Sequence, residues 1–200
     1  MKIGILGGSF SPVHNGHIFL AGYIRENCRL DKVIMIPNGI HPFAEKQNMP
    51  DAVHRLRMLE LAVEGIEGIE VSDIEVRSPG VSYTYITLCR LRETFGKDCT
   101  LYFIIGTDEL LELERWYEAG RLLKEFSFIV GIRPGYSMET VGEKINELKN
   151  RFGADIRIIN LPAPDVSSTE IREAVGKNGD LTGLIPERVN EYIKANGLYK

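Results

Sequence analysis

Two histidines, three residues apart, follow a glycine-rich segment near the start of the chain. The segment reads Gly7-Gly8-Ser9-Phe10-Ser11-Pro12-Val13-His14-Asn15-Gly16-His17. Imidazole N–H groups can donate hydrogen bonds to phosphate oxygens, and glycines let a polyanion approach the backbone closely. The residues therefore indicate a phosphate-binding turn. A plain glycine-rich turn with two surface histidines fits the same pattern, as does a zinc site completed by His41 or His54.

A second group of polar residues lies late in the chain, in the run Ser167-Ser168-Thr169-Glu170-Ile171-Arg172. Ser167 followed by Glu170 is the pattern of a helix-capping box, which is a sufficient structural reason for both residues. A capped helix start is also an anion site, because its free N–H groups and the helix dipole favour negative charge. Arg172 would add a guanidinium suited to phosphate.

Three common nucleotide or nucleophile motifs are absent from the sequence. It has no G-x-x-x-x-G-K-[ST] loop, no G-x-G dinucleotide fingerprint and no G-x-S-x-G nucleophile turn. Nucleotide chemistry in this chain must therefore use a different phosphate-binding turn, for which residues 7–17 are the candidate.

Apolar, β-branched runs alternate with helical patterns along the chain, which predicts the elements that position these residues. The expected strands are Lys2–Leu6, Lys32–Ile36, Glu70–Val76, Thr100–Ile105, Phe126–Ile132 and Ile156–Ile159. The expected helices are His17–Asn27, Asp51–Glu64, Thr84–Phe95, Glu109–Lys124, Thr140–Arg151, Thr169–Gly176 and Pro186–Asn196.

This alternation predicts an α/β fold with a doubly wound, mostly parallel sheet flanked by helices. No linker, repeat or low-complexity tract interrupts it, so we expect one domain over residues 1–200. Ligands of such sheets lie outside the carboxyl ends of the strands, near the point where strand order reverses. Most of the unusual residues follow strands, which favours an enzyme or a ligand-binding protein.

Composition limits the class of protein. The chain has 200 residues, 24 Lys and Arg against 28 Asp and Glu, and a net charge of −4, which argues against a nucleic-acid platform. No apolar run approaches the length of a membrane helix. Its three cysteines form no C-x-x-C pair, and we expect reduced thiols in a cytoplasmic protein. The sequence does not define the oligomeric state, and a homo-oligomer is one possible assembly.

The two groups of polar residues together resemble the nucleotidyltransferase superfamily. Its (H/T)-x-G-H signature is met by His14-Asn15-Gly16-His17, and its S-S-T-x-I-R signature by Ser167-Ser168-Thr169-Glu170-Ile171-Arg172. The two signatures stand in the expected order, each at the start of an expected helix. The resemblance implies a Rossmann-like nucleotidyltransferase fold.

Within that superfamily the chain is most similar to the bacterial nicotinate-nucleotide adenylyltransferases. Further matching segments are Ile36–Gly39, His54–Leu59, Pro79–Thr84, Phe103–Asp108, Trp116 and Arg133–Tyr136. The resemblance implies adenylyl transfer from ATP to nicotinic acid mononucleotide in NAD biosynthesis. The products would be nicotinic acid adenine dinucleotide and pyrophosphate, with Mg²⁺ carried by the ATP phosphates and no metal ligand from the protein.

The resemblance also implies roles for individual residues. His14, His17 and Arg172 would be the catalytic residues. ATP would be bound by these three and by Gly8, Ser9, Phe10, Asp108, Ser168 and Thr169. The mononucleotide would be bound by Asn38, Thr84, Trp116 and Arg133. From the residues alone, the single tryptophan Trp116 fits a core position, the commoner place for a tryptophan.

The sequence departs from the family pattern at three places. Ser11 stands where the family has Asp in F-D-P, and Ile86 where it has Asp in S-Y-T-x-D-T. The P-P-H-K stretch reads His41-Pro42-Phe43-Ala44, with Lys46 out of register. Because the last two departures fall on the acceptor side, nicotinamide mononucleotide or another phosphate monoester remains an alternative acceptor. A nucleotide-binding regulator without turnover is the alternative from another class.

Overall fold

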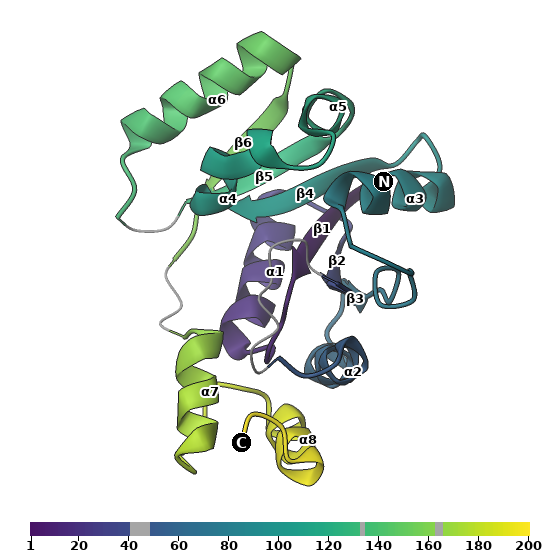
Figure 1. The fold of residues 1–200 in the computed structure, drawn as a ribbon. Coiled ribbons are helices and arrows are strands. Elements are labelled where there is room, and N and C mark those ends of the chain that lie inside the picture. Colours follow the sequence, from purple (N-terminus) through teal and green to yellow (C-terminus); the bar gives the residue numbers. More distant parts are fainter. Residues whose placement is uncertain (41–48, 133–134, 163–165) are drawn as a thin grey trace.

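The computed structural model describes residues 1–40, 49–132, 135–162 and 166–200. In this part of the chain, six strands form one sheet in the order β3-β2-β1-β4-β5-β6, and all neighbours are parallel (Figure 1). Strand order reverses between β1 and β4, as in a doubly wound fold. The strands are β1 (Lys2–Gly8), β2 (Lys32–Pro37), β3 (Ile69–Val71), β4 (Thr100–Gly106), β5 (Ser127–Ile132) and β6 (Asp155–Asn160).

Helices connect the strands and follow the last one. They are α1 (Asn15–Asn27), α2 (Ala52–Val63), α3 (Thr84–Phe95), α4 (Thr107–Glu112), the 3₁₀ turn η1 (Leu113–Arg115), α5 (Ala119–Glu125), α6 (Met138–Phe152), α7 (Ser168–Gly176) and α8 (Glu187–Asn196). The α/β class and the parallel sheet expected from the sequence are confirmed.

The two faces of the sheet each carry a hydrophobic core, because neighbouring residues of a strand point to opposite faces. In β4, Phe103 lies in the core formed with α3, α4, α5 and α6, whereas its neighbours Tyr102 and Ile104 lie in the core formed with α1, α2, α7 and α8. Figure 1 shows α7 and α8 near α1 and α2, away from α6. One face of the sheet is therefore covered by helices from both ends of the chain.

Two expected elements are wrong. The single helix predicted over Glu109–Lys124 is α4, η1 and α5, and it is interrupted at Trp116, which has extended backbone, and at Glu118, whose φ is +54°. The strand predicted over Glu70–Val76 pairs with β2 only at Ile69–Val71. Beyond it the chain turns, and the Glu75 carboxylate accepts a hydrogen bond from Thr87 at 2.7 Å. In both places local tertiary contacts override the apolar pattern.

The segment between α7 and α8 is joined to the start of α1. The backbone N–H of Asn15 donates to the Leu184 carbonyl at 2.9 Å, and its side chain donates to the Gly183 carbonyl at 2.8 Å. These bonds satisfy polar groups at the start of α1 and fix the late helices against the β1–α1 turn. Among the described residues, no helix is long and apolar enough to cross a membrane.

Candidate active site

Residues 9–14, here called the β1–α1 loop, leave the carboxyl end of β1 beside the point where strand order reverses. Phe10 has a φ of +45°, which is costly for a side chain with a Cβ, and it is almost fully buried. Such strain persists only where surrounding contacts fix it. The loop is therefore a position that the rest of the fold enforces.

Three side chains from distant elements hold the carbonyls of this loop. Arg55 donates to the Ser9 carbonyl at 2.7 Å, and Arg172 to the Ser11 carbonyl at 2.7 Å. The Ser168 hydroxyl donates to the Pro12 carbonyl at 3.0 Å. Because these carbonyls accept hydrogen bonds from Arg55, Ser168 and Arg172, the loop is fixed by α2 and by α7.

The two histidines lie together at the start of α1. The His14 backbone N–H donates to Nδ1 of His17 at 3.3 Å, and the rings stack with centroids 3.6 Å apart. Since Nδ1 of His17 accepts, a neutral His17 ring carries its proton on Nε2. Phe10 packs edge-on against His17 at 5.0 Å. The arrangement fixes the ring of His17 and makes Nε2 its donor.

His14 is buried, and burial lowers its pKa to about 4 against a weaker opposing effect of Glu170. The ring is therefore neutral at physiological pH. Its Nδ1 is buried with no hydrogen-bond partner among the described residues. A buried polar atom without a partner is costly, and a ligand atom would remove that cost.

The start of α7 faces the same loop. Ser167 caps the helix through a reciprocal pair of bonds with Glu170, as the sequence predicted. Arg172 donates one bond to the Ser11 carbonyl and another to the Thr169 hydroxyl at 3.1 Å. The structure thus brings Ser168, Thr169 and Arg172 to the β1–α1 loop, beside the start of α1.

Arg55 is a residue whose function the sequence analysis missed. It is 1% exposed, and it donates to the carbonyls of Pro50, Ser9, Asn38 and Gly39 and to Oδ1 of Asn38. A buried guanidinium with this many acceptors joins the ends of β1 and β2 rigidly. The sequence signal for it was its place in the segment His54–Leu59, which matches the family, but that match gives no role for the side chain.

Asn38 and Thr84 belong to two segments that are joined by hydrogen bonds. The Gly39 N–H donates to the Ser82 hydroxyl at 3.1 Å, and the Ser82 N–H donates to the Ile40 carbonyl at 2.8 Å. A Cβ on Gly39 would lie 2.5 Å from the Glu75 carbonyl oxygen, so a glycine is required there. The start of α3 therefore lies beside the end of β2.

Glu75 contacts both segments of this junction, through Gly39 and Ser82. Burial raises the pKa of its carboxyl group, although hydrogen bonds from Thr87, Ser82 and Gly39 and the charge of Arg55 oppose the shift. The side-chain oxygen of Asn38 accepts a hydrogen bond from Arg55 at 2.8 Å. Its position in the site is thus set by Arg55 as much as by β2.

Trp116 lies between the core and the surface. Its ring packs edge-on against Phe103 of β4, with centroids 6.0 Å apart, and it is partly buried. The next residue, Tyr117, stacks on Tyr83 at 4.5 Å, immediately before Thr84. The interruption between η1 and α5 therefore lies beside the start of α3, with Trp116 and Thr84 next to the stacked pair.

Asp108 is the second residue of α4 and is exposed, directly after the carboxyl end of β4. Gly8 ends β1, the neighbouring strand. The two residues thus follow adjacent strands on either side of the point of reversal. The predicted site residue Arg133 lies outside the described residues, as do the departures at His41, Phe43, Ala44 and Lys46.

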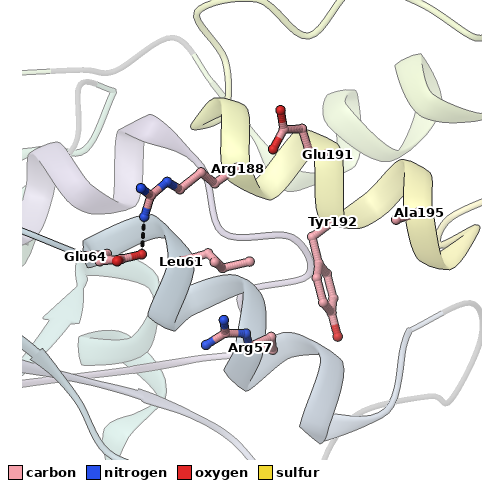
Figure 2. Close-up of a pocket in the computed structure, with 7 residues that line it drawn as sticks. All are labelled: Arg57, Leu61, Glu64, Arg188, Glu191, Tyr192 and Ala195. Atoms are coloured by element: carbon pink, nitrogen blue, oxygen red, sulfur yellow. Dashed lines mark hydrogen bonds and ion pairs between the residues drawn. The ribbon is translucent and has the colours of Figure 1, made fainter.

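No group of three or more His, Cys, Asp or Glu side chains suited to a metal occurs in the described ranges. His54, considered above as a zinc ligand, has its Nδ1 on the Tyr192 hydroxyl at 2.9 Å. A hollow of about 560 Å³ lies between α2 and α8 (Figure 2). Its lining includes the ion pair of Arg188 with Glu64 and contains none of the predicted site residues.

Comparisons with known proteins show the family to which the chain belongs. The cytidylyltransferase-like family model matches residues 5–174. The chain is 38% identical to a protein of Clostridium tetani named "Probable nicotinate-nucleotide adenylyltransferase", over 100% of this chain and 99% of the relative. A protein of the same name from Thermoanaerobacter is 37% identical, over 100% and 95%.

Among solved structures, the nicotinic acid mononucleotide adenylyltransferase of Plasmodium falciparum complexed with NaAD has a TM-score of 0.80. It is 23% identical, and the match covers 99% of this chain and 97% of that one. This likeness shows the fold.

Proposed function

The chain belongs to the cytidylyltransferase-like family and, within it, to the nicotinate-nucleotide adenylyltransferases, and from this we propose that it transfers the adenylyl group of ATP to nicotinic acid mononucleotide. The products are nicotinic acid adenine dinucleotide and pyrophosphate. The reaction is a step of NAD biosynthesis.

One observation carries the proposal from the side of the structure. The starts of α1 and α7 meet the same loop, with His14 and His17 on one helix and Ser168 and Arg172 on the other. Two helix starts with imidazole, hydroxyl and guanidinium donors form a site for a polyphosphate.

The reaction needs no covalent intermediate with the protein. A phosphate oxygen of the mononucleotide attacks the α-phosphorus of ATP in line, a new P–O bond forms, and the bond to the bridging oxygen of pyrophosphate breaks. The attacking and leaving groups are both phosphates, which ionise readily, so the reaction needs no strong general base or general acid. Catalysis therefore consists of orientation and of stabilising charge on the phosphates.

The ATP side is assigned as follows. His17 donates from Nε2 to a phosphate oxygen, and neutral His14 offers a second ring next to it. The backbone of Gly8, Ser9 and Phe10 lines the nucleotide, and Asp108 lies by its ribose. Among the described residues, Arg172 uses two of its five N–H donors, and we assign the others to the β- and γ-phosphates.

The acceptor side is formed by the junction of β2 with α3 and by Trp116. Thr84 begins α3, whose N-cap residue Tyr83 makes no side-chain capping bond. The N–H groups of that helix start suit the carboxylate of a nicotinate ring. Trp116 offers a face to the ring, and Asn38 and Arg133 complete the assigned set.

The family uses ATP together with a divalent metal, which we assign as Mg²⁺. The donors gathered at the β1–α1 loop are imidazole, hydroxyl and guanidinium groups, which suit phosphate oxygens rather than a bare cation. This donor set fits a metal that arrives on the nucleotide, where Mg²⁺ keeps most of its water and phosphate ligands. Bound there, the ion neutralises charge on the phosphates.

We also propose a cytoplasmic location and a single domain. A cytoplasmic location is supported by three free cysteines, Cys28, Cys89 and Cys99. A single domain over residues 1–200 is supported by one sheet whose two faces are covered by helices from both halves of the chain.

The test is pyrophosphate release, followed together with chromatography of the dinucleotide product. We expect one pyrophosphate for each dinucleotide formed, only when ATP and nicotinic acid mononucleotide are both present. ATP binding without pyrophosphate release under any acceptor would contradict the proposal and favour a nucleotide-binding regulator.

A further inference from the structure

The residues after α8 turn back toward the β1–α1 loop. Gly197 ends the helix with a φ of +61°, and the Leu198 N–H donates to the Ile193 carbonyl at 3.1 Å. A bond of this kind reverses the chain at a helix end, and it needs a residue that accepts a positive φ. Leu198 and Tyr199 then pack against the core shared with α1 and α7.

The Tyr199 side chain reaches the centre of the loop. Its hydroxyl lies 3.1 Å from the Ser11 hydroxyl, and Ser11 is 4% exposed. Ser11 directly follows the strained Phe10, and its carbonyl accepts the bond from Arg172. One residue of the loop is thus held through its side chain by Tyr199 and through its carbonyl by a proposed ATP ligand.

Both arginines that hold the loop also act on Tyr199. Burial raises the pKa of the phenol to about 12, although the Ser11 hydrogen bond and the charges of Arg55 and Arg172 lower it. The hydroxyl therefore keeps its proton at physiological pH, and it can donate to Ser11 or accept from it.

From these contacts we infer that Tyr199 is a positioning residue for ATP, acting through Ser11 on the β1–α1 loop and on Arg172. The inference rests on the proposed function for its meaning, since it supposes that this loop binds the nucleotide. Without the phenol oxygen, Ser11 loses its side-chain anchor. Arg172 then loses the fixed carbonyl that orients its guanidinium.

The experiment compares the Tyr199→Phe variant with the wild type, because phenylalanine keeps the packing ring and removes only the oxygen. ATP affinity is measured by calorimetry without the mononucleotide, and steady-state constants are measured for both substrates. We expect the Kd of ATP to rise ~3- to 10-fold, as the loss of one hydrogen bond predicts. The KM of the mononucleotide should stay within about 2-fold, as for a site that the change does not touch.

Two further variants sharpen the test. Ser11→Ala should weaken ATP binding by the same factor, and the double variant should be no weaker than either single one, because both remove one contact. Tyr192→Phe is the matched control. Tyr192 lines the hollow between α2 and α8 (Figure 2), and its hydroxyl bonds His54, so ATP affinity should not change.

Two results would overturn the inference. An unchanged Kd of ATP in Tyr199→Phe would show that the hydroxyl positions nothing. Equal weakening of both substrates with a lower melting temperature would show general destabilisation. Because calorimetry measures ATP alone, it tests Tyr199 even if the wild type fails to use nicotinic acid mononucleotide, so the two failures are distinguishable.

Discussion

At the scale of single residues, the state of the two histidines follows from their surroundings. Nδ1 of His17 accepts a backbone bond, and His14 is neutral because it is buried. A stacked pair at 3.6 Å would be repelled if both rings were charged. The pair therefore supplies directed N–H donors rather than two full charges.

His17→Ala should lower turnover ~10²–10³-fold, as the loss of one preorganised donor to a charged transition state does. The measurement is kcat at saturating substrates, with circular dichroism to check the fold. His54→Ala serves as the control, because His54 contacts Tyr192 outside the site. A folded His17→Ala enzyme with more than half of the wild-type turnover would refute the role.

Arg172→Lys should raise the KM of ATP much more than that of the mononucleotide. A guanidinium can hold Ser11, Thr169 and a phosphate at once, whereas an ammonium has three donors on one atom and cannot reproduce that geometry. Arg188→Lys, on the ion pair with Glu64, should leave both constants unchanged. Equal changes in the two KM values would speak against phosphate binding by Arg172.

The buried His14 predicts a dependence of stability on pH. Its pKa is about 4 in the folded chain and 6.5 as the ordinary value, so the unfolded chain binds the proton more readily. This contribution is complete above pH 6.5 and is lost as the pH falls toward 4. Between pH 7.5 and 5 it amounts to about 2 kcal/mol.

Urea unfolding of the wild type and of His14→Asn at the two pH values checks this prediction. The wild type should lose about 2 kcal/mol more unfolding free energy than the variant as the pH falls to 5. An identical loss in the two proteins would mean that His14 titrates normally in the folded state.

At the scale of elements, the start of α7 is both a structural cap and a part of the proposed site. Ser167→Ala should cost about 1 kcal/mol of unfolding free energy, and it should also raise the KM of ATP. Ser137 caps α6, far from the loop, and accepts from the Thr140 N–H. Ser137→Ala should therefore lower stability without changing the KM, and a similar KM change in both variants would contradict the assignment.

The elements that the sequence predicted well are those with a local signal. The capping box of α7, the two histidines at the start of α1 and the apolar strand β4 depend on neighbouring residues, and the structure has them as expected. The interruption at Trp116 and the end of β3 depend on contacts between distant segments. The role of Arg55 was equally invisible, because its acceptors come from three separate stretches of chain.

At the scale of the whole molecule, the two substrates are assigned to different strand ends of the sheet. In the proposed site, the loop after β1 and the start of α7 form the ATP side, and the junction of β2 with α3 forms the acceptor side. Arg55 connects the two, since it holds both Ser9 and Asn38. A rigid connection of this kind keeps the two substrates in fixed relative positions, as in-line transfer requires.

The most direct test of the account is the ratio of kcat/KM for nicotinic acid mononucleotide and nicotinamide mononucleotide, each with ATP. The helix start at Thr84 offers N–H donors to a carboxylate, and Ile86 adds no negative charge nearby. A site built around a charged group leaves its donors poorly paired with the neutral analogue. We predict a preference for the acid of at least ~10²-fold, about 2.7 kcal/mol. Comparable values for the two substrates would contradict the acceptor assignment.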